Sequence, residues 1–274
     1  MATGVTSVQE HENDTAEVDI VAEPESASLM MGTLHPRGSL YERPVNAELA
    51  TKQHAAFREQ LRTHGVKVLN LRDILAYNVE ENVSARVDLE DLAFSALDYE
   101  MESGHKLAEL AEGDRKYVSD DYKRKVVEHM SVPQLIDTIM INPTVRITPS
   151  YRDTGLSATY TFQPLSNLVY TRDQQITTCK GIVMGRLRSL QRLREVMVMN
   201  FVFRKLGLKV IGSIINPGYL EGGDFFPIGK DLCMLGIGLR SNMAACQQLM
   251  DMDTLGTRRF AIVKDDFDRH QYFF

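Results

Sequence analysis

The chain of 274 residues is long enough for one large domain or two small ones, and its 43% hydrophobic and 25% charged residues are ordinary proportions for a soluble globular protein. Its net charge of −6 provides no basic field for a phosphate backbone, so small molecules are expected as partners and nucleic acid is not. The cysteines Cys179, Cys233 and Cys246 form no close pair. Neither a disulfide framework nor a zinc cluster is therefore supported, and a reducing, cytoplasmic compartment is expected.

The N-terminal segment, residues 1–26, is acidic and poor in large apolar side chains, which predicts a disordered tail. The first 36 residues contain no Lys or Arg. This composition argues against a secretory signal and a mitochondrial presequence, and no run of the chain is long and apolar enough to predict a membrane span. Residues 29–34 are apolar and predict a short buried strand before the proline and glycine of residues 36–38.

A helix is predicted next, because Ala50, His54, Phe57 and Leu61 recur at three- and four-residue spacing before a stop at Gly65. A strand follows at 66–71. Residues 73–140 are charged and predict a helical insertion without a convincing strand. The domain that begins at residue 27 and runs to residue 274 therefore carries an inserted helical part.

The second half of the chain predicts strands alternating with helices. The predicted strands are 167–171, 181–184 and 209–215, a hairpin over 225–236, and 259–263. The predicted helices are 188–206 and a second helix capped by Ser241 that ends near Met250. Polar residues follow several of these strands, so they are expected to line one shared cavity.

Two acidic elements stand at the ends of predicted strands. One runs from Asn167 to Asp173, and the other is Glu221-Gly222-Gly223-Asp224. Paired carboxylates beside a backbone freed by glycine suit a cationic ligand. A surface turn is the alternative for the second element alone.

These residues are similar to those of the arginine deiminase family. Arg192 and Arg240 complete the pattern, because they follow Asp173 and Asp224 at the family's spacing, and the resemblance covers about residues 28–269. It implies an α/β fold, the five-bladed α/β propeller of the guanidine-modifying superfamily, incomplete here. An incomplete propeller leaves strand edges unpaired, so marginal stability is expected.

The resemblance also implies roles for these residues. Asp173 and Glu221 would grip a substrate guanidinium or organise the chemistry around it, and two carboxylates suit this planar, donor-rich cation. Asn167, Arg192 and Arg240 would hold the amino-acid end of the substrate. Gly222, Gly223 and Asp224 would support the loop. The implied substrate is L-arginine, hydrolysed to citrulline and ammonia without metal or organic cofactor; a homo-oligomer is left open.

The family chemistry needs a cysteine thiolate and a histidine, which the resemblance places in segments that do not occur in this chain. His270 and Cys179 are the local alternatives, and the simpler interpretations are a solvated terminal histidine and a structural cysteine. The chain is therefore expected to be truncated and to lack turnover. A non-catalytic arginine-binding or regulatory remnant, and an amidinotransferase, are the alternative functions.

Overall fold

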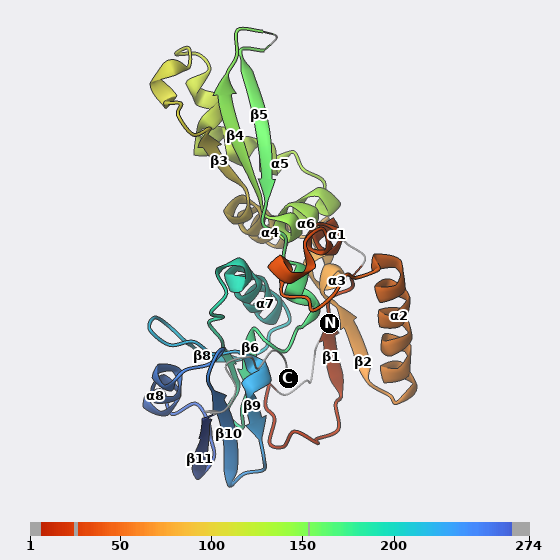
Figure 1. Cartoon of the computed structure of the whole chain (residues 1–274). Helices are drawn as coiled ribbons and strands as arrows, with labels where there is room; N and C mark the ends of the chain where they lie inside the picture. The colour runs from red at the N-terminus through yellow and green to blue at the C-terminus, as the bar shows by residue number, and fades with distance from the viewer. Residues whose placement is uncertain (1–6, 25–26, 153, 265–274) are drawn as a thin grey trace. The chain divides into compact units, whose positions relative to one another are not determined.

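The computed structural model describes residues 7–24, 27–152 and 154–264, which form helices and small sheets (Figure 1). These residues fall into two compact units. The first unit takes the chain up to Glu23, the segment Lys52–Ile74 and the chain from Asn167 onward. The second takes Pro24–Thr51 and Leu75–Ser166. Every predicted site residue therefore belongs to the first unit.

The first unit contains a strand, strand, helix, strand repeat. Strand β6 (Gln175–Thr177) pairs antiparallel with β7 (Ile182–Met184), and α7 (Leu193–Lys205) leads to β8 (Val210–Ser213), which pairs parallel with β7. Parallel neighbours require a crossover connection, and α7 provides it. The predicted strand at 181–184, the helix and the strand that follows it are confirmed.

The same order recurs further along the chain. Strand β9 (Phe225–Pro227) pairs antiparallel with β10 (Leu232–Ile237), and α8 (Met243–Asp251) leads to β11 (Arg259–Lys264), parallel to β10. The predicted hairpin, helix and last strand are confirmed. The predicted cap is wrong, because Asn242 caps α8 by accepting from the Ala245 amide.

The prediction of disorder is wrong for part of the N-terminal segment. Strand β1 (Val18–Val21) pairs parallel with β2 (Lys67–Asn70), and α2 (Ala47–Thr63) lies between them in the chain. The segment is acidic on average, but four of its residues form this strand. Three of the four are β-branched and apolar, which favours a strand. Residues 1–6, 25 and 26 of this segment lie outside the described residues. The predicted helix and the strand after Gly65 are confirmed.

Helices dominate the second unit, and a three-stranded sheet accompanies them. Helix α3 (Leu71–Ala76) follows β2 and leads into this unit. The other helices are α1 (Ala27–Thr33), α4 (Val83–Ala96), α5 (Asp120–Glu128) and α6 (Val132–Ile141). The sheet has the order β3 (Asp98–Met101), β4 (Pro143–Pro149), β5 (Leu156–Phe162). The 3-10 helices of the described chain are η1 (Pro36–Ser39), η2 (Leu107–Glu109), η3 (Arg115–Val118), η4 (Ser166–Val169), η5 (Leu190–Arg192) and η6 (Gly222–Asp224).

Three further predictions of secondary structure are wrong. Residues 29–34 lie largely in helix α1, because Leu and Met favour helix and the buried Leu29 and Gly32 share one helical face. The helical insertion contains strand β3, which needs its partner β4 from outside the predicted range. The predicted strand at 167–171 is mostly the 3-10 helix η4, in which the Tyr170 amide donates to the Asn167 carbonyl at 3.0 Å.

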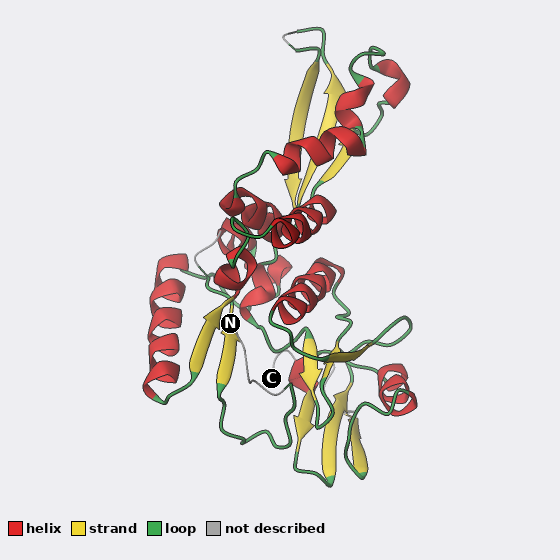
Figure 2. Ribbon diagram, turned by 180° about the vertical axis from the view of Figure 1, so that it is seen from behind, coloured by secondary structure: helices red, strands yellow, loops and turns green. Residues whose placement is uncertain are grey.

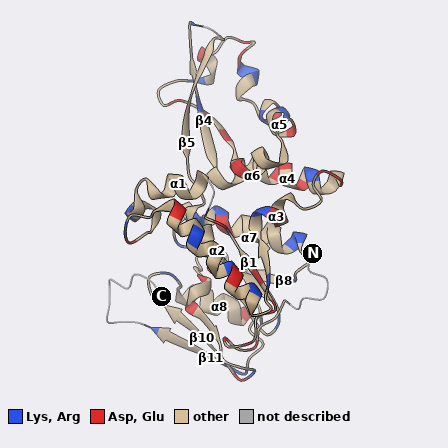
Figure 3. Ribbon diagram, turned by 90° about the vertical axis from the view of Figure 1, so that its right-hand side faces the viewer, with Lys and Arg blue, Asp and Glu red and all other residues tan. Residues whose placement is uncertain are grey.

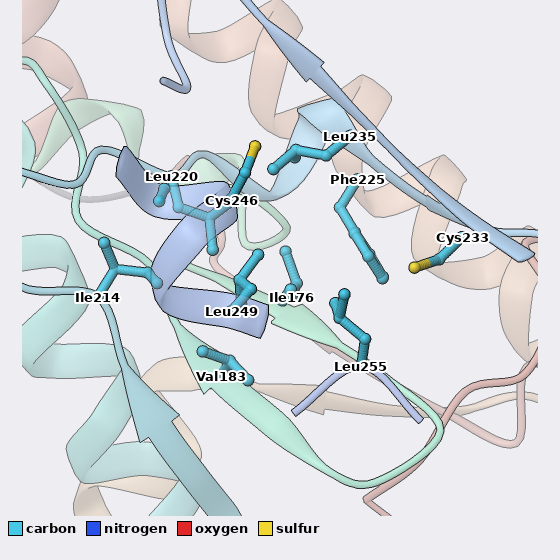
Figure 4. Packing of buried hydrophobic residues seen from close by; sticks show 11 residues of the cluster. Ile176, Val183, Ile214, Leu220, Phe225, Cys233, Leu235, Cys246, Leu249 and Leu255 are labelled. Atoms are coloured by element: carbon cyan, nitrogen blue, oxygen red, sulfur yellow. The ribbon is translucent and has the colours of Figure 1, made fainter. Parts of the chain in front are cut away.

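A buried apolar cluster joins the two repeats of the first unit. Figure 4 shows Phe225 and Leu235 of one sheet beside Ile176 and Val183 of the other, with Leu249 of α8 packed against them. Burial of each such side chain stabilises the fold by about 2 kcal/mol. The cluster therefore fixes the strand ends of both repeats relative to each other.

The described residues have the predicted α/β class, built from separate small sheets (Figure 2). No sheet among them closes on itself, in agreement with an incomplete propeller. Within the same residues no helix is long and apolar enough to span a membrane. The described part of the chain also gathers no group of three or more His, Cys, Asp or Glu that could hold a metal ion.

Candidate functional site

The two acidic elements lie directly against each other in the first unit. The Gly222 amide donates to the Asp173 carbonyl at 2.9 Å, and Arg172 Nε donates to the Gly222 carbonyl at 3.4 Å. A Cβ atom on Gly222 would stand 2.0 Å from the Arg172 carbonyl oxygen and 2.2 Å from that of Gln175. Only glycine permits this approach, so the glycine loop is what brings Asp173 and Glu221 together.

Arg192 is the centre of the site. It ends η5, immediately before α7, and its side chain is 3% exposed. Its Nη2 donates to Asp173 Oδ2 at 2.9 Å, and its Nη1 to Glu221 Oε1 at 3.5 Å. Burial opposes the charge of this guanidinium, but Glu195 and Asp173 outweigh it and raise the pKa of Arg192 above its ordinary value. The buried guanidinium of Arg192 therefore contacts both predicted carboxylates, Asp173 and Glu221.

Asn167 reaches the same cation through its backbone. Its carbonyl oxygen accepts from Arg192 Nη2 at 3.5 Å, and the residue is buried. The structure thus brings Asn167, Asp173, Arg192 and Glu221 together, from segments that are far apart in the sequence.

Glu195 and Gln174 belong to the site although sequence reasoning missed them. Glu195 Oε2 accepts from Arg192 Nε at 3.0 Å and from Gln174 Nε2 at 2.8 Å, and both residues are buried. Burial raises the pKa of Glu195 to about 7, and the charge of Arg192 opposes this rise. The signal available in the sequence was a glutamate three residues after Arg192, on the same helical face as buried Val198 and Met199.

Arg240 joins the site from the loop after β10. Its Nη1 lies 3.2 Å from each carboxylate oxygen of Glu221, and its side chain is 25% exposed. Burial and the charge of Asp173 raise the pKa of Glu221, while Arg240 opposes them. Arg240 is thus the more accessible of the two predicted arginines.

The hydroxyl of Ser241 forms hydrogen bonds with both ends of the glycine loop. Its Oγ donates to Asp224 Oδ2 at 2.6 Å and accepts from the Glu221 amide at 3.0 Å. Burial raises the pKa of Asp224, and the hydrogen bond from Ser241 opposes this rise. The serine that was predicted to cap a helix therefore binds both ends of the acidic element.

The N-terminal segment also reaches the site. Glu12 forms a bidentate ion pair with Arg172, at 2.6 Å to Nη1 and 2.9 Å to Nη2. Arg172 Nη2 donates as well to the Phe225 carbonyl at 3.0 Å. The Glu12 amide donates to the Pro227 carbonyl at 2.8 Å. The segment before β1 therefore fastens the turn that carries Asp173 to the start of β9.

Cys233 and Cys246 are buried, and Cys179 is half-buried. Burial raises the pKa of Cys179 and Cys233, and it raises the pKa of Cys246 to about 11. A raised pKa reduces the thiolate fraction and hence nucleophilicity at neutral pH. His270 lies outside the described residues.

Comparison with known proteins gives one family match. The family model for arginine deiminase matches residues 38–274. Arginine deiminase of Staphylococcus aureus strain JH9 is 25% identical over 226 residues, which cover 77% of this chain and 50% of the relative. The chain therefore spans about half the length of the curated relatives it matches.

Two solved structures show weaker likeness. Dimethylarginine dimethylaminohydrolase in adduct with S-methyl-L-thiocitrulline is 15% identical with a TM-score of 0.49, over 93% of this chain and 63% of that one. An amidinotransferase from Microseira wollei in the saxitoxin biosynthetic pathway is 12% identical, also at 0.49, over 95% and 63%. Because both TM-scores are below 0.5, the family of this chain is inferred from the family model and not from these structures.

Proposed function

Because this chain belongs to the arginine deiminase family, we propose that it forms the arginine-recognising part of a guanidine-modifying enzyme. The proposed reaction of the whole enzyme is hydrolysis of L-arginine to L-citrulline and ammonia. The observation that carries this proposal is the convergence of Asp173, Glu221, Arg192 and Arg240 in one ion-pair network.

The two carboxylates are spaced for a guanidinium. Asp173 and Glu221 both contact the planar cation of Arg192, so they lie within reach of a single guanidinium group. Each carboxylate has two oxygens and accepts several hydrogen bonds. In the proposal, their remaining acceptor positions receive the substrate guanidinium while Arg192 keeps them in place and offsets their mutual repulsion.

Arg240, rather than Arg192, is proposed to bind the carboxylate of the substrate. The Nε and both terminal nitrogens of Arg192 already donate to protein oxygens, and its side chain is buried. Arg240 uses Nη1 for Glu221 and is partly exposed. A guanidinium fork pairs well with a carboxylate, so Arg240 is the residue that would fix the amino-acid end of arginine.

The covalent step needs groups beyond this network. In the chemistry that the family implies, a cysteine thiolate adds to the guanidino carbon and ammonia leaves, which gives a thiouronium; water then releases citrulline and regenerates the thiol. The raised pKa values of Cys179, Cys233 and Cys246 make each of these thiols a weak candidate for that nucleophile. Arginine binding without turnover is therefore the second candidate function.

Calorimetric titration with three ligands tests the proposal. L-arginine has both a guanidinium and a carboxylate, agmatine lacks the carboxylate, and L-lysine lacks the guanidinium. Binding in the order arginine, agmatine, lysine is expected. Arg240→Gln should weaken arginine relative to agmatine by about tenfold to a hundredfold, since a charge-assisted hydrogen bond contributes about 1.5 to 3 kcal/mol. The loss of the Arg240 contact with Glu221 affects both ligands and cancels in this ratio.

The control is Arg258→Gln, because Arg258 is exposed and pairs with Asp231. Equal binding of lysine and arginine, or an arginine to agmatine ratio unchanged by Arg240→Gln, would contradict the proposed recognition. A citrulline assay on the same samples separates the two functions: turnover above background supports a deiminase, and binding without turnover supports the non-catalytic alternative.

A further inference from the structure

Strand β5 is the exposed edge of the sheet in the second unit. The sheet order is β3-β4-β5, and β5 pairs with β4 over the whole of Leu156–Phe162. Every residue of β5 after Leu156 is exposed. Among the described residues no strand pairs with the other side of β5.

The backbone groups on this edge can be assigned from the register. The Gln163 amide donates to the Asn142 carbonyl, and the Ser150 amide donates to the Gly155 carbonyl. In an antiparallel ladder the residues alternate between bonding the neighbour and facing away from it. The amides and carbonyls of Leu156, Ala158, Tyr160 and Phe162 therefore point away from β4.

The edge lacks the usual protection against another strand. Proteins block edge strands with charges, prolines, bulges or a covering segment. The β5 sequence Leu-Ser-Ala-Thr-Tyr-Thr-Phe contains no charged residue and no proline, and β5 is drawn without charge colours in Figure 3. Its register with β4 runs without a bulge. Threonine and aromatic residues also favour a strand.

The sequence of β5 is complementary to itself. In the antiparallel register that pairs all seven residues, Thr159 faces its own copy and the outward-pointing Ala158 faces Tyr160 of the other copy. Ser157 then faces Thr161, and Leu156 faces Phe162. Ala158 thus meets the larger Tyr160, hydroxyls meet hydroxyls, and no residue of β5 brings a charge to its own copy, all of which favour cross-strand pairing. The nearest charge is the carboxylate of Glu102, whose Oε2 accepts from Thr159 Oγ1 at 2.9 Å. The side-chain faces also match, because the register keeps alternate residues on one side.

We propose that two copies of this chain associate through β5, antiparallel, about a two-fold axis at Thr159. The two sheets then form one continuous sheet with the order β3-β4-β5-β5-β4-β3. A two-fold contact uses the same surface on both copies, which is what a self-complementary strand provides. The apolar row of Tyr160 and Phe162 beside Val145 continues across the junction.

The association is expected to be weak. A pair of seven-residue strands buries well under the roughly 1,600 Å² of a standard interface. The measurement is therefore sedimentation velocity of the full chain over a concentration series, in which the mass rises from the 31.0 kDa of the monomer toward twice that value.

Ala158→Pro removes an outward amide without breaking the ladder to β4, because edge strands accept proline where the amide faces solvent. Ala158→Thr keeps the amide and is the matched control. The proline variant should sediment as a monomer with an unchanged circular dichroism spectrum, and the threonine variant should still associate. A chain that is monomeric at every concentration, or a folded proline variant that associates like the wild type, overturns the proposal.

Oxidative cross-linking tests the register. Thr159→Cys places two cysteines opposite each other in a non-hydrogen-bonded pair, with Cα atoms about 4.5 Å apart, within the range of a disulfide. Ser157→Cys places them about 13 Å apart along the strands. The first variant should give a covalent dimer under mild oxidation well above the background from native cysteines, and the second should not. Equal cross-linking of both, or of neither, refutes the two-fold axis at Thr159.

Discussion

Replacing Glu195 by glutamine should change how the stability of the protein depends on pH. The unfolded carboxyl ionises near its ordinary pKa of 4.5, while burial in the fold raises the pKa to about 7. The folded chain therefore binds more protons in this interval, and the unfolding free energy falls as the pH rises from 4.5 to about 7. At about 1.4 kcal/mol per pH unit, the whole effect over this interval is about 3.5 kcal/mol.

The glutamine side chain of the Glu195→Gln variant does not titrate, so the variant lacks this fall. Glutamine keeps one oxygen for Arg192 Nε and, like the protonated carboxyl of Glu195, carries no charge. The wild type and the variant should therefore have similar stability at low pH, and the unfolding free energy of the wild type relative to the variant should fall by about 2 to 3 kcal/mol between about pH 5 and about pH 8.

Urea denaturation of both proteins at several pH values measures this difference, and the other titrating groups cancel because both proteins contain them. Glu59→Gln is the control, since Glu59 is exposed and its contact with Arg62 is long, at 3.7 Å. A stability of the wild type relative to the variant that stays constant, or that increases, as the pH rises would refute the assignment of a buried, proton-holding Glu195 beside Arg192.

Two further substitutions test the scaffold of the site. Gly222→Ala should destabilise the chain by about 3 kcal/mol or more, since the added Cβ overlaps two carbonyl oxygens; Gly238→Ala meets no atom within 4 Å and should be nearly neutral in the same thermal melts. Glu12→Gln should cost about 0.5 to 1 kcal/mol and speed hydrogen exchange at the Glu12 amide, because its pair with Arg172 is half exposed. High salt should abolish that difference, and Glu10→Gln should lack it; a salt-independent loss would contradict an ion pair.

Local pattern was enough to predict several elements. The three- and four-residue spacing before Gly65 predicted α2, and the apolar runs around α7 and α8 predicted β8, β10 and β11. Prediction was wrong where a segment depends on a distant partner. Strand β1 exists because β2 pairs with it, and β3 exists because β4 does. Such pairings join residues far apart in the sequence, so local composition does not predict them.

The site divides in the same way. The motif positions predicted which residues gather, and Asp173, Arg192, Glu221 and Arg240 do meet in the structure. The sequence did not predict which charge pairs with which. The family resemblance implied acids and arginines at opposite ends of a ligand, whereas in the fold Arg192 and Arg240 contact the acids themselves.

The sequence by itself therefore determined the family, the α/β class and which residues form the two acidic elements of the site. These depend on residue identity and short-range spacing. The tertiary structure decided the rest. Only burial raises the pKa of Glu195, and only the close approach at Gly222 requires glycine. Ser241 reaches Asp224, and Glu12 reaches Arg172, only in the folded chain. Charges and hydrogen bonds act through space over a few ångströms, and the folded chain alone sets those distances.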